Sequence, residues 1–194
     1  MKKIFLILLA VASSLPLLAQ GTGDAAVLER LARKSAGLES FSASFVQTAR
    51  SPMLKEPVVS KGEMQYRKDG RIMWRVTSPG SFQLGLTNDN IVITRGGTSE
   101  TISYSDNPLY LQVKNLLMGL MSGEQLSGGG RFELSLTTGK EGTSVTMVPV
   151  QRQLKKMFSS FVISFTPDDI VKQVVMNESD GGSTTIVFDD RKVK

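Results

Sequence analysis

The sequence predicts a mainly β protein, built as one strongly curved antiparallel sheet or barrel of about ten or eleven strands, with two helices. Two observations lead to this prediction. Apolar residues alternate with polar ones through most of the chain after residue 40, which is the period of a strand with one buried face. The connections between these segments are only a few residues long, too short for the crossovers that parallel strands need.

The first twenty residues have the form of a secretory signal peptide. Lys2 and Lys3 precede an apolar run over residues 4–18, and Ala19 and Gln20 follow it. The run of about fifteen residues is shorter than the roughly 20 that a membrane-spanning helix needs. Leu17 stands where a small residue is usual, which leaves an uncleaved anchor as the alternative. We therefore expect a signal peptide over residues 1–20 and a single domain over residues 21–194.

Two later segments have helical spacing. Asp24 can cap a helix of about four turns, in which apolar residues recur every three or four positions. Asn107 and Pro108 are typical of a second helix start, and helical spacing continues to Met121. The apolar arc of this second helix is wider than the roughly 100° that contact with a sheet requires. It is therefore either a deeply buried core helix or a lid between the sheet and an apolar ligand.

Strand segments lie before and after the second helix. Lys68-Asp69-Gly70 and Asp180-Gly181-Gly182 are typical of the tight turns that connect antiparallel strands. We expect strands over residues 41–46, 62–66, 72–76, 82–86, 91–93, 101–104, 132–136, 145–147, 161–165, 174–176 and 186–188. Eight methionines follow residue 20. Because this side chain adapts to irregular shapes, they either fill gaps in a core or line a cavity for an apolar ligand.

The composition excludes several kinds of chemistry. The chain has no cysteine and no histidine, which rules out Ser-His-Asp and Cys-His nucleophiles and the usual zinc sites. The adjacent pairs Asp168-Asp169 and Asp189-Asp190 do not form dyads, since neighbouring strand residues point to opposite faces. We therefore expect no catalytic residue, no metal and no cofactor. Loss of residues 1–20 lowers the net charge from +5 to +3, and the scattered cations do not favour nucleic acid.

The order of these parts resembles the LolA family of periplasmic lipoprotein carriers, over nearly all of the chain after residue 20. The resemblance is carried by Phe41-Ser-Ala-Ser-Phe45-Val-Gln47, Gly62, Trp74-Arg-Val-Thr-Ser-Pro79 and the helix near 107–122. It implies an unclosed antiparallel β-barrel with an N-terminal helix and a lid helix over its concave hydrophobic side. It also implies a periplasmic carrier, most simply a monomer, that shelters the acyl chains of lipoproteins and contacts membranes only transiently.

The resemblance implies partners and site residues as well. Cargo would come from an inner-membrane ABC transporter of the LolCDE type and pass to an outer-membrane receptor of the LolB type. That receptor is lipid-anchored, so the absence of cysteine favours the carrier. We expect inward-facing residues to line the acyl-binding cavity: Met64, Trp74, Phe82, Leu84, Leu134 and Phe161. The expected lid residues are Leu109, Val113, Leu116, Leu117 and Leu120. A shift of one residue in strand register would turn these side chains to the other face.

The family also implies a latch for the lid. Relatives commonly carry an Arg-Pro pair before the tryptophan strand, and the Arg holds the lid closed. Lys68-Asp69 stands at that position, between Arg67 and Arg71. Lysine lacks the planar fork of arginine, so we expect the latch to be Lys68 or one of the two neighbouring arginines.

Other functions remain open from the sequence. The chain could be a binding module of the same fold that carries another lipid, or a regulatory subunit that senses lipoproteins. Two further alternatives are a hydrolase that uses carboxylates and a structural envelope protein with a dry core.

Overall fold

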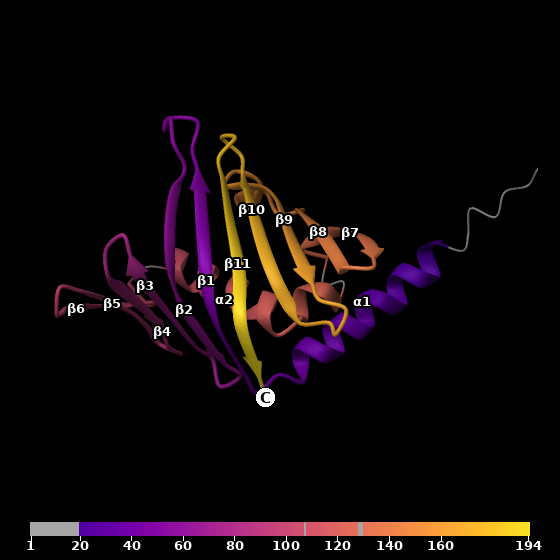
Figure 1. The fold of residues 1–194 in the computed structure, drawn as a ribbon, viewed down its shortest axis with the longest axis horizontal. Coiled ribbons are helices and arrows are strands. Elements are labelled where there is room, and N and C mark those ends of the chain that lie inside the picture. Colours follow the sequence, from indigo (N-terminus) through magenta and orange to yellow (C-terminus); the bar gives the residue numbers. More distant parts are fainter. Residues whose placement is uncertain (1–19, 107, 128–129) are drawn as a thin grey trace, which may run out of the picture.

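One antiparallel sheet of eleven strands forms the body of the protein (Figure 1). The computed structural model describes residues 20–106, 108–127 and 130–194. The strands are β1 (Ser40–Arg50), β2 (Val58–Arg67), β3 (Arg71–Ser78), β4 (Phe82–Leu86), β5 (Asn90–Arg95), β6 (Thr98–Ser103), β7 (Phe132–Gly139), β8 (Gly142–Pro149), β9 (Phe158–Phe165), β10 (Val171–Glu178) and β11 (Ser183–Val193). The prediction of a mainly β fold with about eleven strands is confirmed.

The order of the strands makes the sheet an open one. It runs β6-β5-β4-β3-β2-β1-β11-β10-β9-β8-β7, so that in the part of the chain described β6 and β7 form its two edges. Consecutive strands pair as hairpins from β1 to β6 and from β7 to β11, and the pairing of β1 with β11 joins these two halves of the sheet. A bulge between Ser42 and Ser44 interrupts that central pairing. The unclosed antiparallel barrel predicted from the family resemblance is therefore confirmed.

The helical elements of the described residues are α1 (Gln20–Ala36), α2 (Pro108–Met121), a 3-10 turn η1 (Glu124–Ser127) and the short α3 (Arg152–Lys155). Both α1 and α2 pack against η1. Two ion-pair contacts attach α1 to the β9–β10 turn, where Arg30 Nη2 and Nε lie 3.0 and 2.9 Å from the two carboxylate oxygens of Asp169. The prediction that Asp24 caps the first helix is wrong, because Asp24 lies inside α1.

Aromatic side chains make up the middle of the core. The rings of Phe45 and Trp74 stack with centroids 4.0 Å apart, and Phe188 meets Trp74 edge-on at 6.4 Å. Gly62 lies directly beneath this cluster. A Cβ atom at Gly62 would lie 1.9 Å from the carbonyl oxygen of Arg75 and 2.7 Å from the Phe45 ring. Only glycine allows this close approach of β2 to β3 and to the aromatic cluster.

Candidate functional site

One face of the sheet, here called the inner face, carries the buried core and the contacts with the helices. In the β2–β5 half, Met64, Trp74, Leu84 and Ile93 lie directly opposite one another on successive strands. Residues that are paired in this way share a face of an antiparallel sheet. Phe82 lies on the same side, opposite the buried Val76.

A second row crosses the other half of the sheet. Leu134, Met147, Phe161 and Met176 are paired across β7, β8, β9 and β10. All six side chains predicted to line a cavity therefore lie on the inner face. The side of the sheet assigned to these residues from the sequence agrees with the observed strand register.

The inner-face side chains are of two kinds: buried ones, here called the floor, and half-buried ones that remain partly accessible, here called the wall. Met64 and Phe161 are buried, so other protein atoms cover them. Trp74, Phe82, Leu84 and Leu134 are only half-buried although they point to the core side. Several further side chains that were not predicted to line the cavity have the same half-buried character: Ile93, Leu136, Phe158, Val174 and Met176. The same alternation of apolar residues would have identified most of them.

Helix α2 is held firmly near its C-terminal end. Leu120 and Met121 are buried, and Leu117 and Met118 pack against the core. At Gly119 a Cβ atom would lie 2.4 Å from Nε2 of Gln125, so η1 approaches the helix closely there. Of the predicted lid residues, the side chains of Leu109, Val113 and Leu116 lie outside the part that the structure describes.

A lysine connects the middle of α2 to the sheet. Lys114 is only 9% exposed, and its Nζ lies 3.4 Å from both the backbone oxygen and Oδ1 of Asn88, in the β4–β5 turn. The ammonium group also lies 5.6 Å from the centre of the Tyr104 ring. Burial, with a smaller effect from Asp89, raises the pKa of the Tyr104 hydroxyl. Lys114 was not selected from the sequence, although a lone cation in an apolar helix was a usable signal.

The three predicted latch residues lie around the neighbouring β2–β3 turn. Lys68 Nζ is 2.9 Å from Glu39 Oε1, and Arg67 and Arg71 both contact Asp69. These side chains are exposed. The hydrogen bond from Arg71 is the main reason that the pKa of Asp69 falls to about 2. Asn88 Nδ2 donates to the Asp69 backbone oxygen at 3.2 Å, which links this turn to the Lys114 contact.

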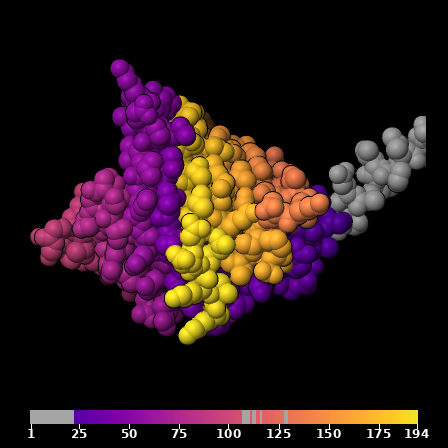
Figure 2. All heavy atoms as spheres, in the orientation of Figure 1, coloured from indigo at the N-terminus to yellow at the C-terminus, as the bar shows by residue number. Residues whose placement is uncertain are grey.

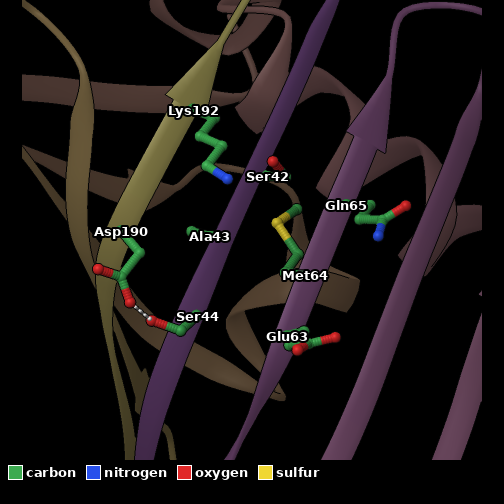
Figure 3. A pocket seen from close by; sticks show the side chains of 8 residues that line it. All are labelled: Ser42, Ala43, Ser44, Glu63, Met64, Gln65, Asp190 and Lys192. Carbon is green, nitrogen blue, oxygen red and sulfur yellow. Dashed lines mark hydrogen bonds between the residues drawn. The ribbon is translucent and has the colours of Figure 1, made fainter.

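An open polar pocket of about 290 Å³ lies over β1, β2 and β11 (Figure 3). Ser44 donates a hydrogen bond of 2.9 Å to Asp190. Asp190 and Glu63 come from strands on either side of β1 and do not point toward one another (Figure 3). This arrangement offers no pair of carboxylates for acid–base chemistry. Among the described residues, no group of three or more acidic, His or Cys side chains is placed to hold a metal ion.

The fold and the inner face define the class of protein: an unclosed antiparallel β-barrel with apolar side chains that are only partly buried on one face. The family described as outer membrane lipoprotein carrier protein LolA matches residues 36–194, and the chain belongs to this family. No match is found among curated protein sequences. Within the described residues, no helix has the length and apolar character needed to cross a membrane.

Two solved structures with TM-scores of 0.50 or above have a similar fold. The lipoprotein LppX from Mycobacterium tuberculosis has 14% sequence identity and a TM-score of 0.51, over 88% of this chain and 95% of LppX. MucB has 14% identity and a TM-score of 0.50, over 89% of this chain, which spans only 59% of the MucB chain. A LolA superfamily protein from Nitrosomonas europaea aligns at 8% identity with a TM-score of 0.43, over 86% of this chain and 93% of that one. At these identities the likeness concerns the fold alone.

Proposed function

We propose that this protein is a periplasmic carrier that binds the acyl chains of lipoproteins on its inner face. In this proposal it receives cargo from an inner-membrane transporter of the LolCDE type and delivers it to an outer-membrane receptor of the LolB type. The observation that carries the proposal is the set of half-buried apolar side chains on the inner face, close to a helix that itself packs on the core. The family match and the form of residues 1–20 support the periplasmic location.

The physical need for such a carrier follows from hydrophobic transfer. Exposing an acyl chain to water costs roughly 0.8 kcal/mol per methylene. A triacylated lipoprotein has on the order of 40 methylenes, so unassisted transfer through water would cost roughly 30 kcal/mol. An apolar face that replaces water around the chains removes most of this cost. No bond is made or broken, so the function requires no catalytic residue.

We assign two roles to the inner-face residues. Trp74, Phe82, Leu84 and Leu134 would contact the acyl chains, because part of each side chain is accessible. The buried Met64 and Phe161 would form the floor beneath them. Helix α2 would be the lid. Cargo can displace it only if cargo binds better to the open position than to the closed one.

The test introduces one charge on the inner face. Leu134→Asp should strongly reduce the release of a labelled lipoprotein from inner-membrane vesicles, because a carboxylate would lie where an acyl chain binds. Ser135→Asp is the matched control, since it places the same charge on the next residue of β7, which faces away. Circular dichroism and thermal melting would verify that both variants fold. Equal release by a folded Leu134→Asp variant and by its control would contradict the proposal.

A LolA-fold module for another lipid is the second candidate, because the same apolar wall would fit any diacyl lipid. Native mass spectrometry of protein isolated from its host separates the two. A bound diacyl lipid without an attached protein favours this second candidate, and a bound lipoprotein favours the carrier.

A further inference from the structure

The β1–β2 hairpin extends beyond the strands on its β3 side. We call residues 50–61 the finger. Pairing of β2 with β3 ends at Lys61 and Ser78, whereas β1 and β2 stay paired as far as Ala49 and Val58. Figure 1 shows this hairpin rising at the top of the sheet, and Figure 2 shows its tip standing clear of the neighbouring surface. The finger is therefore accessible from several sides.

The finger exposes more apolar side chain than its position in a turn requires. Met53 is 89% exposed, Leu54 54%, Val58 49% and Val59 47%. Other hairpins of the sheet turn through polar or small residues, as at residues 68–70 and 179–182. Four large apolar side chains gathered on one projecting hairpin are a mark of an interaction site.

Charged residues flank the apolar tip. Arg50, Lys55 and Lys61 lie within the finger, against one acid, Glu56. The adjacent β10–β11 turn lies beside Arg50 and Pro52 of the finger and carries Asp180, whose side chain accepts a hydrogen bond of 2.9 Å from the backbone N–H of Gly182. Lys55 directly follows Leu54, and Arg50 comes three positions before Met53, whereas Lys61 lies lower on the hairpin, paired with Val46. Cations commonly lie beside an apolar segment that enters the surface of an anionic membrane.

The apolar character of the finger continues onto the inner face. Val58 is paired with Ala49, Ala49 with Thr184, and Thr184 with Met176. Met176 belongs to the inner-face row that ends at Leu134. Directly paired residues share a face, so Val58 lies on the same side of the sheet as the apolar wall. The finger and the apolar wall are therefore accessible from the same side of the sheet.

We propose that the finger docks the protein on a phospholipid bilayer, with Met53 and Leu54 entering the interfacial region and with Arg50 and Lys55 facing anionic headgroups. A narrow hairpin tip is small compared with the roughly 800 Å² per partner of a stable protein interface. Two inserted side chains give weak, reversible binding, which suits a protein that must leave the surface again. The proposal concerns the bilayer and does not depend on which lipid or lipoprotein the inner face binds.

The experiment uses local labels in the full chain. Because the chain has no cysteine, Met53→Cys provides a single position for an environment-sensitive fluorophore. Val148→Cys, at the exposed position of β8, is the matched control. Vesicles of phosphatidylethanolamine with a minor fraction of phosphatidylglycerol should shift the emission of the Met53 label to the blue and leave the Val148 label unchanged. The label reports its own surroundings, so membrane affinity of residues 1–20 does not produce this contrast.

A second variant measures the contribution of the tip. Met53→Ser with Leu54→Ser should lower the partition of the protein into these vesicles by about tenfold or more, whereas Val148→Ser with Val187→Ser should not. An unshifted Met53 label, or an equal shift at both labels, overturns the proposal. So does vesicle binding that survives the double finger variant, because surface charge alone would then explain it.

Discussion

Replacing Asn88 by Ala removes one of the two oxygen atoms that contact the ammonium group of Lys114. Lys114 is buried on α2, so its charge is left with less compensation when the helix lies over the inner face. In a displaced helix the same ammonium group would reach water. We therefore expect Asn88→Ala to shift α2 toward the displaced position and to strengthen the binding of an apolar ligand.

The size of the effect follows from the geometry. A hydrogen bond to a charged group is worth about 1.5–3 kcal/mol. The contact from Lys114 Nζ to Asn88 Oδ1 is long, at 3.4 Å, so we take the lower end, about 1.5 kcal/mol. That free energy corresponds to a change of about tenfold in an equilibrium constant. The Kd of a ligand that competes with α2 should fall by about the same factor.

The assay is equilibrium binding of a dansyl-labelled fatty acid, followed by its fluorescence. Asn88 also donates to the Asp69 backbone oxygen, and Asn88→Ala removes that bond too. A double-mutant cycle separates the two effects. In a Lys114→Met background the buried charge is gone, so Asn88→Ala should leave the Kd nearly unchanged. An equal change of Kd in both backgrounds would refute the role given to Lys114, and so would no change in either.

Three further outcomes are expected. Gly62→Ala should destabilise the protein by about 3 kcal/mol or more in urea unfolding, because the new Cβ would lie 1.9 Å from a backbone oxygen. Gly80 has open space around it, so the control Gly80→Ala should destabilise the protein far less. Arg71→Gln should raise the pKa of Asp69 from about 2 toward its ordinary value, as measured by carbon NMR. Because the pKa of Asp69 is depressed in the folded protein, its contact with Arg71 stabilises the fold above about pH 4, and this stabilisation is lost as the pH falls toward 2. A brominated fatty acid should quench the fluorescence of Trp74, the sole tryptophan, and unquenched emission at saturating ligand would count against binding on the inner face.

The alternation of apolar residues predicted the strands and the face to which their side chains point. It succeeded where a strand buries one side only, as in Phe41, Ala43 and Phe45 of β1. The pairing of β1 with β11 was not predictable from local pattern, since it joins residues more than 130 positions apart, such as Phe45 and Phe188. The family resemblance supplied the open barrel that periodicity alone left undecided.

The polar contacts of the site were harder to predict. The latch expected by analogy of position at Lys68, Arg67 or Arg71 stays a prediction; in the structure these exposed cations contact Glu39 and Asp69. A contact that was not predicted starts on α2, at Lys114, and ends on a turn 26 residues earlier in the chain. Sequence spacing carries no information about such a pair, because only the folded sheet brings the β4–β5 turn beneath the helix.

The way in which α2 is attached bears on how a carrier could release its cargo. Its C-terminal end is fixed, since Gly123 lies so close to Ala32 of α1 that a Cβ atom would come within 2.8 Å of a backbone oxygen. In its middle, the described side chain of Lys114 makes two long contacts to Asn88. A ligand that lifts the N-terminal part of α2 therefore has to break the weak contact and can leave the strong one intact. If α2 is the lid of the proposed carrier, the free energy of these broken contacts is what cargo must outweigh on loading and what favours its release.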